Sequence, residues 1–133
     1  MQRIYVVTNG MYSDMYIAGA STSLVDAAKI VVDKACTEYP LIDVFEGGNR
    51  IEGEGSLHFM YCNLWGSEIA PAREDIIDYV PGNVNVPPIV KVFPDAKWSP
   101  AVFVIGAEHS KVAQAFSDTL AAEAAKRGWV SKW

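Results

Sequence analysis

Residues 24–39 carry apolar side chains at the spacing of one helical face, and segments typical of strands lie on both sides of them. Charged and polar residues occupy the opposite face, which predicts an amphipathic helix that ends at Pro40. Residues 21–23 offer hydroxyl groups for its N-cap, and Asp26 adds favourable negative charge to its first turn. A helix with one apolar face must be covered by a sheet or by another helix. The apolar positions are Leu24, Ala28, Val31, Val32, Ala35 and Tyr39.

The segments around this helix are short and rich in β-branched and aromatic residues. RIYVVT at 3–8 and MYIAGA at 15–20 predict an antiparallel pair of strands joined by a loop. LIDVF at 41–45 predicts a third strand. The glycine-rich stretch at 46–56 predicts a loop or a loosely paired hairpin. LHFMYCNLW at 57–65 is apolar on both faces, which predicts a strand covered on both sides.

The second half of the chain holds further strands and a closing helix. Residues 70–82 are ambiguous, since the charges at their start suit a helical turn and IIDYV suits a short strand. IVKVF at 89–93 and AVFVIGA at 101–107 predict a final pair of strands. We expect Ser110 to cap the last helix and Gly128 to end it. Its apolar stripe is formed by Val112, Phe116, Leu120 and Ala124.

The order of these elements predicts one α+β domain over residues 1–133, with an antiparallel sheet, a helix after the second strand and a long C-terminal helix packed on the sheet. Alanines line that helix, which allows close approach of a second subunit or simply reflects high helix propensity. They lie at positions 113, 115, 121, 122 and 125.

Charge and composition exclude several classes of protein. The net charge of −5 argues against binding of nucleic-acid polymers, although a few basic residues can still hold one small anion. No stretch approaches the length of a membrane span, and the N-terminus shows no signal-peptide pattern. We therefore expect a cytoplasmic protein. Cys36 and Cys62 give no disulfide framework or zinc spacing, which favours two reduced thiols.

Motifs for catalysis are missing from the sequence. It has no G-x-S-x-G, Walker or H-E-x-x-H motif, and only two histidines, His58 and His109. His58 and Cys62 share a strand face but are well separated along it, which argues against a nucleophilic pair. We therefore expect no enzyme, no catalytic residue, no metal site and no cofactor.

Two arginines are candidates for binding an anion. Arg50 lies in the glycine-rich stretch, which is otherwise acidic and unsuited to phosphate. Arg73 is isolated among acidic neighbours, and a surface ion pair with Glu74 or Asp78 is the structural alternative.

Two further segments combine an aromatic residue or a helix end with a cation. Lys97 and Trp98 lie between two prolines, with Phe93 just before, and suit the stacking of a base beside a phosphate. The alternative is that Trp98 covers the sheet. His109 and Lys111 lie at the start of the last helix, where free N–H groups favour anions.

The loop between the first two strands reads NGMYSDMYIAG. Asn9-Gly10 is typical of a hairpin turn. The turn does not require Tyr12, Ser13 and Asp14, or the second tyrosine, Tyr16. Two interpretations remain open: a turn in which Ser13 and Asp14 bond its own backbone, and a loop shaped for a ligand.

The strands that flank Y-S-D, the helix that follows, and the ending AVFVIGA, Glu108-His109, a long helix and Gly128-Trp129 together resemble the phage anti-Thoeris proteins. The resemblance covers the two ends of the chain, about half of it. Those proteins are sponges that bind cyclic ADP-ribose signals, and in some cases cyclic oligonucleotides, between the subunits of an oligomer without cleaving them.

The resemblance implies a homo-oligomer that sequesters a cyclic nucleotide messenger and so blocks bacterial immune signalling. Tyr12 and Tyr16 would pack on the ligand, Ser13 and Asp14 would bond ribose hydroxyls, and Phe93 or Trp98 would stack on the base. The terminal helix here reads FSDTLAAEAA where those proteins carry basic residues. The phosphate would therefore have to be bound by Lys111, Arg50, Arg73 or Lys97. Two alternatives remain, an inhibitor that docks on a host defence protein and a hydrolase of the messenger.

Overall fold

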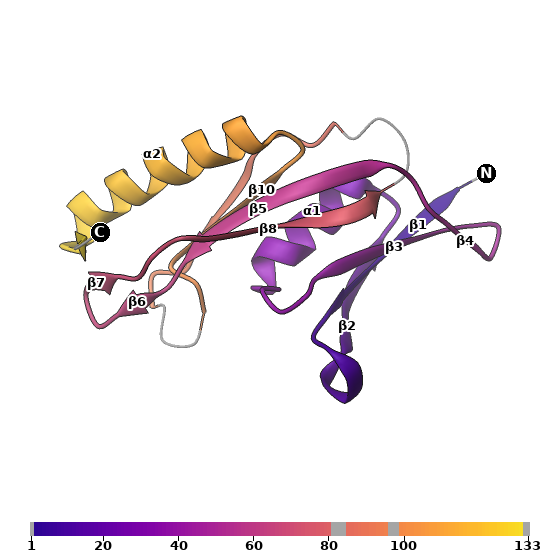
Figure 1. The fold of residues 1–133 in the computed structure, drawn as a ribbon, viewed down its shortest axis with the longest axis horizontal. Helices are drawn as coiled ribbons and strands as arrows, with labels where there is room; N and C mark the ends of the chain where they lie inside the picture. The colour runs from indigo at the N-terminus through magenta and orange to yellow at the C-terminus, as the bar shows by residue number, and fades with distance from the viewer. Residues whose placement is uncertain (1, 81–84, 96–98, 132–133) are drawn as a thin grey trace.

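The computed structural model describes residues 2–80, 85–95 and 99–131, and within them the chain forms three sheets and two α-helices (Figure 1). Helix α1 (Leu24–Asp33) contacts strands of both larger sheets, whereas α2 (His109–Arg127) packs along the second of them. The predicted α+β class is confirmed, with antiparallel sheets, a helix after the second strand and a long C-terminal helix.

The first sheet, here called the N-terminal sheet, has the strand order β2-β1-β3-β4, and every pair in it is antiparallel. One face is buried, because alternate residues such as Tyr5, Val7 and Val44 point into the core. The glycine-rich stretch forms a paired hairpin, since Gly47 and Gly48 supply the positive φ angles of its turn. The strands are β1 (Arg3–Asn9), β2 (Tyr16–Ser21), β3 (Leu41–Glu46) and β4 (Asn49–Ile51).

Helix α1 begins where the sequence predicts and ends before the predicted position. The hydroxyl of Ser23 accepts a hydrogen bond from the amide of Asp26 at 3.3 Å, which caps the first turn. The prediction that the helix continues to Tyr39 is wrong, because the last helical residue is Asp33. Ala35 and Tyr39 both have φ near +50°, so the chain leaves the helix and turns toward β3.

The second sheet, here called the central sheet, has the order β8-β5-β10-β9 and is also antiparallel. Residues 70–82, ambiguous in sequence, supply β8, where Ile77 and Val80 reach the core. Both faces of β5 are covered by apolar groups, as predicted. The strands are β5 (Gly55–Cys62), β8 (Arg73–Val80), β9 (Ile89–Val92) and β10 (Val102–Gly106).

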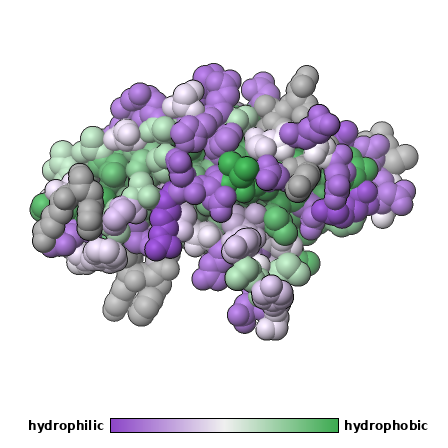
Figure 2. All heavy atoms as spheres, viewed as in Figure 1, coloured by the Kyte–Doolittle hydropathy of each residue, from purple (hydrophilic) through white to green (hydrophobic). Residues whose placement is uncertain are grey.

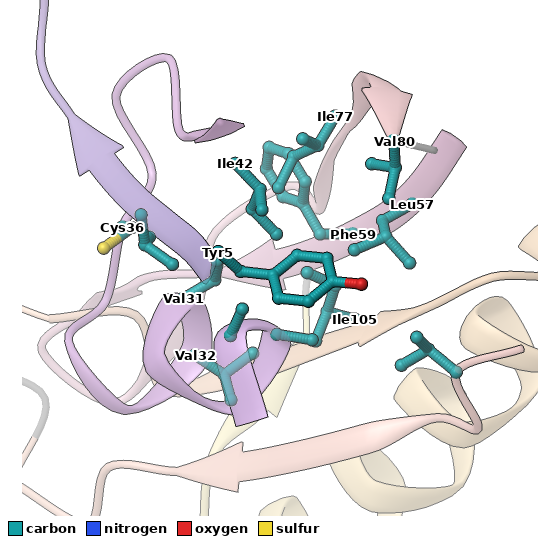
Figure 3. Close-up of a cluster of buried hydrophobic side chains, with 14 of the residues drawn as sticks. Tyr5, Val31, Val32, Cys36, Ile42, Leu57, Phe59, Ile77, Val80 and Ile105 are labelled. Atoms are coloured by element: carbon teal, nitrogen blue, oxygen red, sulfur yellow. The ribbon is translucent and has the colours of Figure 1, made fainter. Parts of the chain in front are cut away.

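Two apolar clusters lie on opposite faces of the central sheet. The larger joins this sheet to α1 and the N-terminal sheet, and Tyr5, Phe59 and Ile105 meet within it (Figure 3). The smaller lies under α2, where Val112 and Phe116 pack on β5 and β10. Strand β10 is buried along its whole length because it contributes to both clusters.

Helix α2 has the predicted apolar stripe and the predicted end. Gly128 adopts a left-handed conformation with φ of +73°, and its amide bonds the carbonyl of Ala124. The prediction that Ser110 caps the helix is wrong, because Glu108 is the N-cap residue and its side chain makes no capping bond. No helix among the described residues has both the length and the apolar character needed to cross a membrane.

A third, small sheet was not predicted from the sequence. Its strands are β6 (Leu64–Trp65), β7 (Glu68–Ile69) and β11 (Val130–Ser131). Strand β11 pairs with β7 in parallel, which ties the segment after α2 to the end of β5.

Candidate functional site

The loop between β1 and β2 is a short 3₁₀ turn over Tyr12–Asp14 that projects from the body of the molecule (Figures 1 and 2). Backbone bonds hold it: the amide of Asp14 donates to the carbonyl of Met11, and that of Met15 to Tyr12. The side chains of Ser13 and Asp14 make no hydrogen bond or ion pair within the described residues. The structure therefore does not support the interpretation that these two side chains satisfy the turn's own backbone.

Asn9 anchors this loop to the turn that precedes β3. Its side-chain oxygen accepts a hydrogen bond from the amide of Glu38 at 3.0 Å, and its side-chain amide donates to the Tyr16 hydroxyl at 3.3 Å. The amide of Gly10 also bonds the carbonyl of Glu38 at 2.6 Å. The base of the loop is thus fixed, and its tip remains open to solvent.

Three tyrosines surround this anchor. Tyr12 at the tip is 92% exposed, Tyr39 beside Glu38 is 65% exposed, and Tyr16 is 51% exposed. Tyr12 and Tyr39 also have φ near +50°, a conformation that costs a bulky residue about 1 kcal/mol or more. Exposed aromatic rings on a fixed backbone form a surface on which a planar base can stack.

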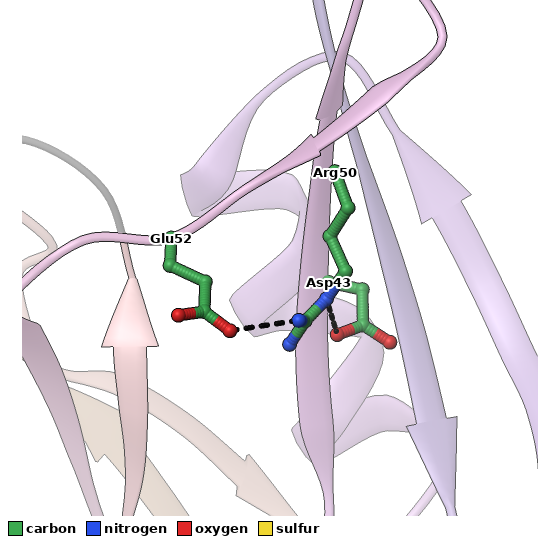
Figure 4. Close-up of polar contacts among 3 residues, drawn as sticks. All are labelled: Asp43, Arg50 and Glu52. Carbon is green, nitrogen blue, oxygen red and sulfur yellow. Dashed lines mark hydrogen bonds and ion pairs between the residues drawn. The ribbon is translucent and has the colours of Figure 1, made fainter.

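Two of the predicted cations are already paired. The guanidinium of Arg50 lies 3.1 Å from Asp43 and 2.8 Å from Glu52 (Figure 4), and the hydrogen bond to Asp43 is the main cause that raises its pKa. Lys111 lies 3.4 Å from Glu108. Neither side chain stands free to neutralise a phosphate.

Arg73, at the start of β8, has no carboxylate partner within the described residues. The two acids proposed for it from the sequence bond elsewhere: Glu74 contacts His109 at 2.9 Å, and Asp78 accepts from Ser56 at 2.9 Å. The alternative interpretation, in which Arg73 forms a surface ion pair with Glu74 or Asp78, is therefore wrong. Arg73 is the unpaired arginine of the described chain.

Arg73 also lines two neighbouring cavities. The cavity of about 350 Å³ is formed with Thr37, Tyr61 and other residues of β5 and β8. The cavity of about 180 Å³ includes Tyr61, Asn63 and Trp65, whose indole is 60% exposed. Thr37 precedes Glu38, so this surface continues from the anchor of the hairpin to Arg73. We call it the Arg73 groove.

Phe93, one of the two aromatic residues predicted to stack on a base, is not among the residues that line the Arg73 groove. Phe93 is partly buried against the larger apolar cluster, and Lys91 lies 5.9 Å from its ring centroid. Only part of the Phe93 side chain is therefore exposed, and its stacking on a base stays a prediction. Lys97 and Trp98 lie outside the described residues. Trp65 was missed, since two-residue strands leave almost no periodic pattern in sequence.

The two histidines of the chain meet at the start of α2. His109 Nε2 lies 2.9 Å from Glu74 Oε2, and the ring of His58 lies edge-on to that of His109 at 5.5 Å between centroids. Sequence analysis named His109 and not this cluster, because 51 residues separate the two histidines. A cavity of about 290 Å³ lies beside them and is also lined by Asp75 and Ile76.

Both cysteines are buried and free, as expected. Burial raises the pKa of Cys36 and of Cys62 to about 11, so both are neutral thiols near pH 7. A thiol in this state is a poor nucleophile. In the described part of the chain, no group of three or more His, Cys, Asp or Glu side chains could hold a metal ion.

Most predicted site residues that the structure describes lie in three places, whereas Arg50 on β4 and Phe93 after β9 lie outside them. Tyr12, Ser13, Asp14 and Tyr16 share the hairpin, Arg73 lines the groove beside its anchor, and His109 and Lys111 start α2. A scan against protein-family models, a search of curated proteins and a search of solved structures each found no match.

Proposed function

We propose that this protein binds and sequesters a cyclic nucleotide-derived immune messenger without cleaving it, as a phage protein that blocks bacterial immune signalling. The hairpin carries the proposal. Its backbone is fixed by Asn9, Gly10 and Glu38, while Tyr12, Ser13 and Asp14 hold their side chains in solvent without internal partners. Such preorganised groups bind a ligand at low entropic cost. The resemblance of Y-S-D and its flanking strands to anti-Thoeris sponges points to the same loop.

The groups around the hairpin match the parts of such a messenger. Tyr12 and Tyr16 offer faces for a base or ribose, and Ser13 and Asp14 offer acceptors for ribose hydroxyls. Arg73 is free to contact phosphate oxygens in a bidentate way, and Trp65 lies on the same groove for a second base. An unpaired guanidinium can hold a small anion even though the chain has a net charge of −5.

A second copy of the chain would complete this site. Thr8 pairs with both Ile17 and Leu41, so these residues share one face of the N-terminal sheet with Ile4. We call this side the outer face. Ile4, Ile17 and Leu41 are 48%, 69% and 46% exposed.

A standard interface buries about 800 Å² of each partner, and the exposed apolar side chains of the outer face and of the hairpin are suited to such a contact. The open tip of the hairpin would then be closed from the other side. We expect a homo-oligomer in which the messenger lies between subunits.

Calorimetry with cyclic ADP-ribose isomers and cyclic oligonucleotides tests the proposal. We expect one of these compounds to bind at a fixed ratio per subunit. Phosphate and linear ADP-ribose serve as controls that carry the same charged groups without the closed ring. Absence of binding to every cyclic compound would contradict the proposal.

The outer face also favours a second candidate function, an inhibitor that docks on a host defence protein. Exposed apolar side chains that share one face can form an interaction surface, and the occupant need not be another copy. This alternative predicts a monomer in solution and a bacterial partner in pull-down experiments, with no small ligand. Replacement of Ile17 by Asp would abolish that capture, whereas the sequestering function predicts that the same change breaks the homo-oligomer.

A further inference from the structure

Strand β2 forms one edge of the N-terminal sheet, since β1 is its neighbour in the strand order and no other described strand pairs with it. Alternate residues of an edge strand direct their backbone N–H and C=O groups away from the sheet, where a further strand can bond them. All six residues of β2 are exposed or half-buried, and the first two, Tyr16 and Ile17, are 51% and 69% exposed. The edge is therefore accessible to another chain.

The other edges of the two larger sheets carry residues that hinder strand pairing. Edge strand β4 holds Arg50, β9 holds Lys91, and β8 holds three acidic residues, Glu74, Asp75 and Asp78. Strand β2 reads YIAGAS and has neither a charged residue nor a proline. Because natural edge strands avoid association by means of charges and prolines, β2 is the edge best suited to pairing.

Large apolar side chains gather on the segment that leads into this edge. Met11, Tyr12, Met15, Tyr16 and Ile17 are five of the twelve exposed large hydrophobic residues in the described chain. They lie within seven consecutive positions, so exposed apolar area is concentrated beside β2 and not scattered over the surface. A concentration of this kind is typical of a contact with another chain.

We propose that β2 pairs antiparallel with β2 of a second copy of this chain, which joins two four-stranded N-terminal sheets into one continuous sheet. A two-fold axis brings the same surface of both copies together. Because β2 carries no charge, the two edges meet without like charges in contact, although each chain has a net charge of −5. The inference deepens the homo-oligomer of the proposed function and rests on that part of it.

The pairing of β2 with β1 shows which side chains share a face. Ile17 and Ala20 lie on the outer face, because their partners in β1 alternate with the core residue Val7. Tyr16 and Ser21, at the two ends of β2, lie on the inner face. An antiparallel register that uses all six residues sets Ile17 opposite Ala20 of the second copy, and Tyr16 opposite Ser21. A shift by one residue would set outer side chains opposite inner ones, so this register is the matched one.

The same pairing borders the proposed ligand loop with a second chain. Continued beyond the strand, the register places Met15, at the base of the hairpin, next to Thr22 of the second copy. The outer faces of the two copies then lie on one side of the joined sheet. The apolar face available for contact with further copies is thereby doubled.

Disulfide cross-linking between two different variants tests both the pairing and its register. Directly opposite residues of antiparallel strands have Cα atoms about 4.5–5.5 Å apart, within the range that a disulfide joins. Ile17→Cys and Ala20→Cys are mixed in equal amounts, left to exchange subunits and mildly oxidised. We expect at least about five times more covalent dimer than from either variant alone, because the two copies of one position lie about 10 Å or more apart.

Asn49→Cys is the matched control. Asn49 is exposed on β4, at the opposite edge of the same sheet, so its mixture with either β2 variant should give no more covalent dimer than a single variant does. Thermal melts should show all three variants folded, since each position is exposed. Equal yields from the mixture and from the single variants, or a monomeric parent chain in sedimentation, would overturn the pairing. Capture of a bacterial protein by a monomeric chain would overturn it in favour of a different occupant.

Messenger binding, measured by calorimetry on the parent chain, separates this inference from the proposed function. A chain whose variants give the cross-link, but which binds no cyclic compound, would contradict sequestration and support the strand pairing. A chain that binds a cyclic compound, but whose variants give no cross-link above the control, would support sequestration and overturn the strand pairing.

Discussion

The central sheet and the N-terminal sheet have similar strands and very different surroundings. The central sheet is covered by α1 on one face and by α2 on the other, and all five residues of β10 are buried. The apolar core of the N-terminal sheet lies on its inner face, while Ile4 and Ile17 on its outer face are 48% and 69% exposed. The central sheet lies at the centre of the buried core, and the N-terminal sheet carries the hairpin that we propose as the binding loop and the exposed apolar side chains of the outer face.

This difference between the two sheets predicts where amino-acid substitutions are tolerated. Because apolar area removed from water drives folding, side chains of β10 contribute most to the free energy of unfolding. The exposed side chains of the outer face contribute little to the fold of one chain, and in the proposed homo-oligomer they would contact the second copy. Stability and binding can therefore be separated by substitution.

Phe103→Ala should give the largest effect. Phe103 is fully buried and packs against Phe59 and Tyr61, so its loss leaves a cavity that costs about 3–5 kcal/mol of unfolding free energy. Ile17→Ala on the outer face should cost less than about 1 kcal/mol. Urea unfolding at concentrations where the chain is monomeric measures both. Equal costs would mean that the two sheets do not differ as described.

Arg73→Gln should lower affinity for the messenger by about tenfold or more, because a charge-assisted bond to phosphate contributes about 1.5–3 kcal/mol. Arg50→Gln is the matched control. Arg50 is already bonded to Asp43 and Glu52, so we expect less than about a twofold change in affinity. Calorimetry measures both variants, and thermal melts should show each of them folded. The reverse ranking would place the phosphate contact at Arg50.

Alkaline pH should weaken the fold through the buried thiols. The pKa of Cys36 and of Cys62 is raised by burial to about 11, above the value of an unfolded thiol. The unfolded chain then loses protons first as the pH rises, so stability present below about pH 8.5 is lost progressively toward pH 11.

We expect the two thiols together to account for a loss on the order of 5 kcal/mol over this range. The double variant Cys36→Ala, Cys62→Ala should flatten this part of the pH profile, as measured by urea unfolding at each pH. An unchanged slope would show that the thiols are not the titrating groups.

Tyr12→Gly should give the smallest change in stability. Glycine accepts the φ of +52° without strain. The unfolding free energy of the variant should therefore differ from that of the parent chain by less than about 1 kcal/mol. Affinity for the messenger should nevertheless drop, since the exposed ring is lost. Gly10→Ala is the contrast: its Cβ would lie 2.5 Å from the carbonyl oxygen of Asp14, so we expect clear destabilisation.

Local patterns predicted much of the fold. The alternation in β5, the stripe Val112 and Phe116 of α2, and Gly128 as its stop all depend on neighbours a few residues apart. The early end of α1 was not predictable in this way. Ala35 gives no local indication of a positive φ, and the turn there places Cys36 in the larger apolar cluster.

The candidate site was predicted only in part. The hairpin residues were found because Y-S-D exceeds what the turn needs, and the structure leaves their side chains free. The difference between Arg73 and Arg50 could not be predicted, because it depends on which carboxylates the register of β3, β4 and β8 places beside each guanidinium. The meeting of His58 with His109 likewise depends on the docking of α2.

Release of a bound compound by heat tests the central claim most directly. The protein is mixed with a cyclic ADP-ribose isomer, freed of excess compound, and denatured, and the supernatant is examined by chromatography with mass detection. We predict that the messenger returns intact at a fixed ratio to the chain, and that the Arg73→Gln variant returns much less. Recovery of a cleaved product would contradict sequestration and identify a hydrolase, and recovery of nothing would contradict binding.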